Sequence, residues 1–187
     1  MCIRDSIWRA TDNCGNTDVA QQVILVEDTT DPVFGNIPGD ITVECDAVPA
    51  PFEPTASDNC DDDVEITLNE TSTQTNNGEC TDDTYEITRT WTAIDNCGNS
   101  VTVSRIIFVE DTTNPVLANV PANITITSLP APAPATNVTA SDNCDGSVLV
   151  TFEEERGVGC EHEIRRIWTA TDNCGNQDVQ VLSLIHI

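Results

Sequence analysis

The sequence predicts an all-β chain of tandem, disulfide-stapled sandwich repeats, and three observations support this prediction. The nine residues at 91–99, Trp-Thr-Ala-Ile-Asp-Asn-Cys-Gly-Asn, recur in closely similar form at 8–16 and 168–176. Apolar and polar residues alternate over short runs separated by turn-forming residues, and no stretch shows helical periodicity. The motif returns after 83 and then 77 residues, a step that suits a small β-sandwich.

The repeated motifs divide the chain into segments. Residues 7–28 are expected to form the C-terminal hairpin of a truncated repeat, 29–111 a complete repeat, and 112–181 a repeat lacking the end of its last strand. The two ends, 1–6 and 182–187, match no repeat position and resemble translated sequencing-adapter read-through. They are expected to be foreign tails outside the fold of an internal fragment of a longer protein.

Each copy of the tryptophan motif predicts a β-hairpin. In the first copy, residues 7–12 and 19–27 would be the strands and 13–16 the turn. The glycine of Asn-Cys-Gly-Asn supplies the positive φ that such a turn needs. In the complete repeat, 85–94 and 101–109 form the same hairpin with longer strands.

The other elements of the complete repeat are short. Strands are predicted at 41–45 and 64–68, where apolar residues alternate with polar ones. Between them, the three prolines at 49–54 mark an irregular edge segment. The acidic loop 58–63 follows this segment.

An arginine shares a strand face with the tryptophan in both longer hairpins. By the period of two, Arg89 lies beside Trp91, and Arg166 lies beside Trp168. The simpler interpretation is an arginine at the sheet margin, with its stem packed on the ring and its guanidinium in water. A ligand-binding role is the alternative.

Composition restricts the partners and the compartment. The net charge is −25, and the chain has seven arginines and no lysine, which disfavours nucleic acid and anionic membranes. Solubility explains this acidity as well as cation binding does. The nine cysteines include no close Cys-x-x-Cys pair, so they indicate disulfides and an extracellular or cell-surface location.

Strand direction predicts how the cysteines of the complete repeat pair. Successive strands of a sandwich alternate in direction, so Cys45 and Cys80 would lie at one end, and Cys60 and Cys97 at the other. The predicted disulfides are therefore Cys45–Cys80 and Cys60–Cys97. Each would contribute roughly 3–4 kcal/mol by loop closure.

The same rule extends to the third repeat. Ser128 stands where the complete repeat has its first cysteine, so Cys144 is predicted to pair with Cys174 and leave Cys160 over. Cys14 would have lost its partner with the truncated repeat.

A calcium site is predicted where the acidic loops meet the linker from the preceding repeat, because Ca²⁺ prefers carboxylate oxygens. The candidate ligands come from three segments and are Glu27, Asp28, Asp31, Asp58, Asp61, Asp62, Asp63 and Asp95. The corresponding residues of the next junction are Glu110, Asp111, Asp142, Asp145 and Asp172. The alternative is that these residues only form turns by bonding their own backbone.

The sequence gives no basis for catalysis. His162 is the single histidine outside the tails, no Ser-His-Asp set recurs in each repeat, and there is no glycine-rich phosphate loop. The chain is therefore predicted not to be an enzyme.

Four motifs together resemble a known family. Asp-Thr-Thr-x-Pro-Val, Ile-Thr-Val, Ala-Ser-Asp-Asn and Trp-Thr-Ala-x-Asp-x-x-Gly-Asn follow one another as in the hyalin repeat family. The cysteines are similar to those of a variant in very large bacterial surface and secreted adhesins. The resemblance implies immunoglobulin-like sandwiches, a role in cell adhesion or as an extracellular spacer, and no catalytic residues.

The predicted function is a structural stalk of an extracellular or cell-surface adhesin, whose immediate partners are the neighbouring repeats. The alternative is a Ca²⁺-dependent module that binds carbohydrate or protein, and a third possibility is an accessory domain of a secreted enzyme. A binding module should expose aromatic anchors in its loops. The aromatic residues here fall mostly in or near predicted strands, which favours the stalk.

Overall fold

The computed structural model describes residues 2–126, 130–157 and 163–186. The chain forms two compact units. The first comprises Met1–Pro38, Pro51–Glu70 and Arg89–Arg105, and the second comprises Gly39–Ala50, Thr71–Thr88 and Ile106–Ile187. The boundary between the units falls inside residues 29–111, so the division into repeats stays a prediction. Below, "middle repeat" means residues 29–111 and "C-terminal repeat" means residues 112–186.

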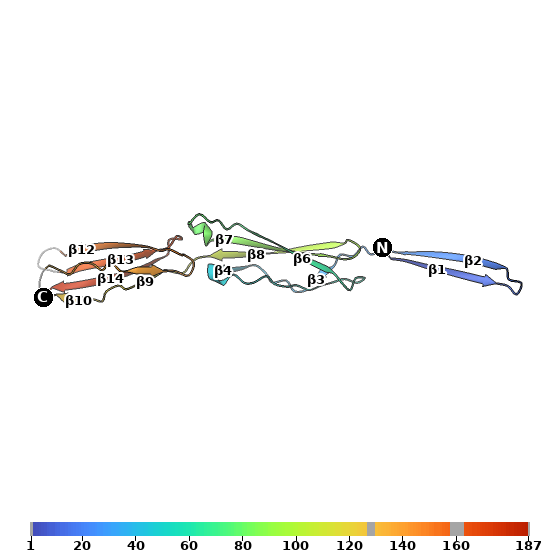
Figure 1. The fold of residues 1–187 in the computed structure, drawn as a ribbon, viewed down its shortest axis with the longest axis horizontal. Coiled ribbons are helices and arrows are strands. Elements are labelled where there is room, and N and C mark those ends of the chain that lie inside the picture. Colours follow the sequence, from blue (N-terminus) through green and yellow to red (C-terminus); the bar gives the residue numbers. More distant parts are fainter. Residues whose placement is uncertain (1, 127–129, 158–162, 187) are drawn as a thin grey trace. The chain divides into compact units, whose positions relative to one another are not determined.

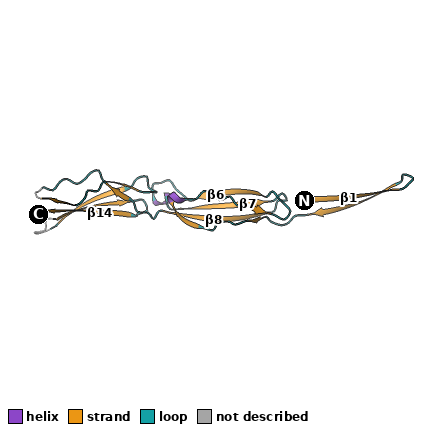
Figure 2. Cartoon of the chain, turned by 90° about the horizontal axis from the view of Figure 1, so that it is seen from below, coloured by secondary structure: helices purple, strands orange, loops and turns teal. Residues whose placement is uncertain are grey.

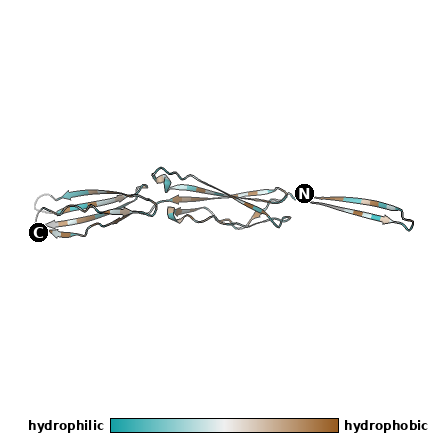
Figure 3. Cartoon of the chain, viewed as in Figure 1, coloured by the Kyte–Doolittle hydropathy of each residue, from teal (hydrophilic) through white to brown (hydrophobic). Residues whose placement is uncertain are grey.

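The N-terminal hairpin joins β1 (Cys2–Thr11) to β2 (Thr17–Val26) in an antiparallel ladder (Figure 1). Its turn has Gly15 at a φ of 89°, in the left-handed region that glycine tolerates best. Asp12 closes the turn by accepting from the backbone N–H groups of Cys14 and Asn16, both at 2.9 Å. The predicted hairpin is therefore present. Both strands carry apolar and polar residues (Figure 3).

The middle repeat has two sheets. Two short strands, β3 and β5, pair antiparallel, and four others form a sheet in the order β4-β8-β7-β6. Strand β4 runs parallel to β8. The strands are β3 (Val33–Phe34), β4 (Ile41–Glu44), β5 (Ala56–Ser57), β6 (Glu65–Ser72), β7 (Tyr85–Ile94) and β8 (Ser100–Glu110).

The C-terminal repeat uses the same plan. Strands β9 and β11 pair antiparallel, the larger sheet has the order β10-β14-β13-β12, and β10 runs parallel to β14. The strands are β9 (Val116–Ala118), β10 (Ile124–Ile126), β11 (Thr139–Ser141), β12 (Leu149–Arg156), β13 (Glu163–Thr171) and β14 (Gln177–His186).

The predicted all-β class is confirmed. Apart from two 3₁₀ turns, η1 (Cys45–Ala47) and η2 (Cys80–Asp82), the described residues form strands and loops (Figure 2). The core follows the period of two. Along β7, Ile87, Trp91 and Ala93 are buried, and along β13, Trp168 and Ala170 are buried in a cluster with Leu117.

The two ends of the chain take part in strands. Residues 2–6 continue β1, and residues 182–186 continue β14 beside β13. Leu182 and Leu184 are buried in the same cluster as Trp168. The described part of residues 182–187 therefore fills the gap at the end of the last strand, and the boundaries of the repeats and tails stay predictions. Leu182 and Leu184 lie two positions apart and so share the buried face, which lets this segment complete the last strand.

The two arginines beside the tryptophans are buried instead of reaching water. Arg89 and Arg166 are only 3% and 4% exposed. Arg89 Nε lies 2.6 Å from Glu70 Oε2, and Arg166 Nε lies 2.9 Å from Glu154 Oε2. The arrangement predicted at the sheet margin is thus wrong, because a carboxylate on the adjacent strand compensates the buried charge.

We expect Glu154→Gln to destabilise the C-terminal repeat by about 2 kcal/mol, because it leaves the buried guanidinium of Arg166 without its carboxylate. The remaining acceptor in contact with Arg166 is the carbonyl oxygen of Pro132, at 2.5 Å. Hydrogen bonds from Arg166, and secondarily from Arg156, lower the pKa of Glu154, so the pair is charged at neutral pH. Urea denaturation measures the loss. The exposed neighbour Glu153 provides the control, since Glu153→Gln should change stability little.

Candidate functional site

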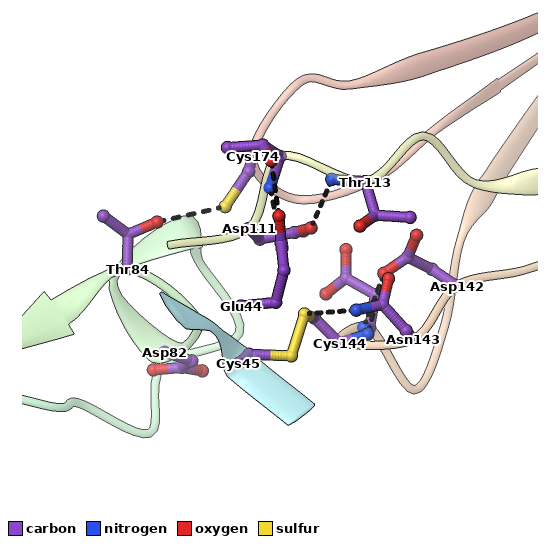
Figure 4. The surroundings of a disulfide bond; sticks show 12 residues. Glu44, Cys45, Asp82, Thr84, Asp111, Thr113, Asp142, Asn143, Cys144 and Cys174 are labelled. Atoms are coloured by element: carbon purple, nitrogen blue, oxygen red, sulfur yellow. Dashed lines mark hydrogen bonds between the residues drawn. A yellow bond between two sulfur atoms is a disulfide. The ribbon is translucent and has the colours of Figure 1, made fainter. Parts of the chain in front are cut away.

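The candidate site lies where the middle repeat meets the C-terminal repeat, wholly within the second unit. Figure 4 shows its parts: β4 with η1, the segment around Asp82 and Thr84, the linker at Asp111 and Thr113, and the loop at 142–144. The turn that carries Cys174, between β13 and β14, completes it. Each part ends or connects strands, so the sandwich architecture brings these segments to one place.

Two disulfides cross this junction. Cys45 of η1 is bonded to Cys144, with a Cα–Cα distance of 5.8 Å (Figure 4). Cys80 of η2 is bonded to Cys174, with a Cα–Cα distance of 4.5 Å. The bonded residues lie 99 and 94 positions apart in the sequence. Both bonds therefore join one repeat to the next.

The predicted pairings Cys45–Cys80 and Cys144–Cys174 are therefore wrong. Cys45 and Cys80 do lie at the same end of the sheet, because β4 ends opposite the end of β8, next to where β7 begins. The missing consideration was the next repeat, whose two Asp-Asn-Cys loops reach the same end. Cys45 and Cys80 are each bonded to a cysteine of these loops and not to one another.

The other cysteines complete the account. The predicted pairing of Cys60 with Cys97 stays a prediction. Cys60 and Cys97 do lie near the same end of the middle repeat, since Asn96 bonds Asp61. The predictions for Ser128, Cys160 and His162 concern residues outside the described ranges.

An acidic cluster lies beside the Cys45–Cys144 bond. Asp111, Asp142 and Asp145 each offer a carboxylate oxygen, and these oxygens all lie within 4.8 Å of one another. Asp111 comes from the linker after β8, and the other two come from the loop after β11. Asp111 is 6% exposed and Asp145 is 8% exposed.

Hydrogen bonds satisfy only part of this cluster. Asp145 accepts from the backbone N–H and side-chain amide of Asn173, both at 2.6 Å. Oδ1 of Asp142 accepts from the N–H of Cys144 at 2.8 Å, and Oδ1 of Asp111 accepts from the N–H of Thr113 at 3.2 Å. The second oxygen, Oδ2, of both Asp111 and Asp142 is buried without a hydrogen-bond partner.

The pKa of Asp111 is raised by its surroundings in the cluster. Burial, and then the negative charges of Asp142, Asp172 and Asp145, raise the pKa of Asp111 to about 6. The backbone N–H of Thr113 opposes this shift only in part. The junction therefore holds a carboxylate whose charge lacks full compensation by the protein.

The site predicted at the preceding junction is only partly assembled. Asp28, Asp58 and Cys60 offer ligand atoms within 4.8 Å of one another in the first unit. Asp61 accepts two hydrogen bonds from Asn96, and Asp95 closes the turn at 95–99, as the turn-forming alternative expects. The remaining candidates are exposed at the surface: Glu27, Asp31, Asp62 and Asp63. Calcium binding by this set stays a prediction.

Comparison with family models gives one match. Residues 33–109 match the HYR-like domain with 4 cysteines. The matched HYR-like segment contains four cysteines, Cys45, Cys60, Cys80 and Cys97. A search of curated proteins finds no match.

Solved structures with distant similarity include ectodomains of cadherins. Drosophila N-cadherin EC1-4 is 16% identical with a TM-score of 0.32, and the alignment covers 99% of this chain and 58% of that one. The protocadherin GammaB4 extracellular domain is 14% identical with a TM-score of 0.34, covering 98% and 40%. The chain thus spans about half the length of these proteins. No helix among the described residues is long and apolar enough to cross a membrane.

Proposed function

We propose that this chain is part of an extracellular, adhesion-type stalk whose repeats are covalently locked to one another. The observation that carries the proposal is the pair of disulfides between consecutive repeats. Disulfides persist in oxidising compartments, which supports a secreted or cell-surface location. The HYR-like match and the charge of −25 suit a spacer that does not bind nucleic acid.

The disulfides give the stalk its mechanical role. Tension on a chain of sandwiches first loads the linker between repeats, here the segment that follows β8. Two additional covalent connections parallel to that linker carry the load when the sheets open. A protease that cut the linker would likewise leave the two repeats joined.

Pulling on single molecules tests this role. The Cys45–Cys144 bond removes 99 residues from the extensible path, which corresponds to about 340 Å of extended chain. We expect the protein with all four bonded cysteines replaced by serine to extend about 340 Å further than the wild type before its chain is taut.

Two controls make the length diagnostic. Replacing only Cys45 and Cys144 should change the extension little, because the Cys80–Cys174 bond still bypasses 94 residues. Pairing within repeats, Cys45–Cys80 and Cys144–Cys174, would instead hide 35 and 30 residues, or about 220 Å of chain. An increase of that smaller size, or no increase, would contradict the proposed lock.

The ligand-binding alternative has weaker support. Phe108 and Phe152 are exposed but lie in strands, and Phe52, at 38% exposed, lies in the loop before β5, so it gives the binding module one candidate loop anchor. A glycan array distinguishes the two functions. Reproducible, selective and calcium-dependent binding by the chain would favour the binding module over the spacer.

A further inference from the structure

We propose that Asp111, Asp142 and Asp145 form a Ca²⁺ site that fastens the linker to the C-terminal repeat. Their oxygens lie within 4.8 Å of one another. Oxygen ligands lie 2.3–2.6 Å from Ca²⁺, so ligands on opposite sides of one ion are separated by about 5 Å. The observed spacing therefore allows all three carboxylates to reach the same ion.

The partners that these carboxylates lack point to a ligand independently of the clustering. Asp111 is more than nine-tenths buried, its carboxylate belongs to the cluster with Asp142 and Asp145, and its Oδ2 is buried without a hydrogen-bond partner. The nearby Asp172 is also 6% exposed, and its Oδ2 is likewise buried without a hydrogen-bond partner. None of the ion pairs among the described residues includes these aspartates. A cation would compensate charges that the protein itself leaves uncompensated.

The donor chemistry selects the kind of cation. The sulfur of Cys144 lies near Asp111 and Glu44, but it is committed to the disulfide with Cys45 and cannot act as a thiolate. Glu44 is held by Thr112, whose backbone N–H donates to it at 3.1 Å. The available donors are therefore carboxylate oxygens. An irregular all-oxygen set suits Ca²⁺ better than Zn²⁺, which favours sulfur and nitrogen, or Mg²⁺, which demands a near-ideal octahedron.

The same arrangement occurs twice in the chain. Asp28 and Asp111 each begin an Asp-Thr-Thr sequence, and Asp58 and Asp142 each begin Asp-Asn-Cys. In the first unit, Oδ2 of both Asp28 and Asp58 is again buried without a partner. Each unit thus contains a pair of aspartates with buried, unpartnered Oδ2 atoms at the same motif positions. The recurrence indicates that the repeated sequence motifs produce this pair.

A thermal melt with the whole chain tests the site. We expect about 5 mM calcium chloride to raise the Tm by roughly 5 °C relative to chelator, since extracellular sites typically have dissociation constants up to about 1 mM. Magnesium chloride at the same concentration should have a smaller effect. No shift with calcium would overturn the proposal.

The variant Asp111→Asn provides the sharper comparison. Without calcium it should melt at a higher temperature than the wild type, because it removes a buried, repelled charge. It should also lose the part of the calcium shift that this site supplies, and calorimetric titration should show one fewer calcium bound. Glu153→Gln makes the same charge change at an exposed position and should leave both measurements unchanged.

The outcomes separate binding from folding defects. If Asp111→Asn lowered the Tm in chelator and kept the wild-type calcium stoichiometry, Asp111 would be a structural residue and the site would be wrong. If stoichiometry fell by one while the Tm in chelator rose, the site would be supported.

Discussion

Replacing all four bonded cysteines by serine is expected to lower the free energy of unfolding of the second unit by about 5 kcal/mol. A disulfide that closes a loop of about 100 residues stabilises by about 4.7 kcal/mol in the chain-entropy model, and measured losses are about 2–5 kcal/mol. The second bond adds less than the first because the two loops overlap over most of their length. The residues concerned are Cys45, Cys80, Cys144 and Cys174.

Chemical denaturation followed by tryptophan fluorescence measures this loss, because Trp168 is buried in the C-terminal repeat. The double variant Cys45→Ser with Cys144→Ser should lose much less than half as much as the quadruple variant, because the Cys80–Cys174 bond still closes a loop of similar length in the unfolded chain. Peptide mapping under non-reducing conditions checks the connectivity directly. Equal denaturation midpoints for the quadruple variant and the wild type would mean that the bonds contribute nothing to stability.

Trp91→Ala should destabilise the middle repeat by about 3–5 kcal/mol, since it removes a large side chain from the core and leaves a cavity. Trp91 is 1% exposed. The matched control is Trp8→Ala, because Trp8 occupies the same motif position but is 54% exposed. Trp8 is covered only in part, so its removal should lose much less transfer free energy than the removal of Trp91.

Urea denaturation of the two variants gives the comparison. A large loss for Trp91→Ala and a much smaller loss for Trp8→Ala would show that the motif tryptophan stabilises most where a sandwich covers it. Equal losses would contradict the burial difference on which the prediction rests.

Local patterns in the sequence were sufficient for the fold. The Asn-Cys-Gly-Asn turns between alternating runs gave the hairpins correctly, as the pairing of β1 with β2 shows. The buried face of β7 also followed from the period of two. Such features depend on residues near one another in the chain, so one sequence is enough to predict them.

The features that were missed depend on distant segments. The ion pair between Arg89 and Glu70 could not be predicted from the residues near Arg89. A long polar loop separates the two strands in the sequence, so their register was not known. The disulfides failed for the same reason, since Cys45 bonds a residue 99 positions away in the next repeat. The repeat pattern did contain a usable signal. Two cysteines at the end of the middle repeat face two cysteines of the next repeat, so pairing between repeats could have been considered.

The acidic residues divide in a similar way. Their gathering near the linkers was predicted from the repeat pattern, and Asp111, Asp142 and Asp145 do come together. Which aspartates would instead close turns was not predictable. Asp95, for example, accepts hydrogen bonds within its own turn at both oxygens: Oδ1 accepts from the N–H groups of Cys97 and Asn99, and Oδ2 accepts from the side-chain amide of Asn99.

The disulfides join different repeats, so one sequence repeat by itself does not contain a complete set of bonded cysteines. The segment from one tryptophan motif to the next contains Cys45 and Cys80, whereas the cysteines bonded to them lie in the following repeat. An isolated middle repeat would carry these two thiols reduced, ready for mispairing or intermolecular crosslinks. A longer array with this pairing therefore requires each repeat to be followed by one that supplies the matching cysteines.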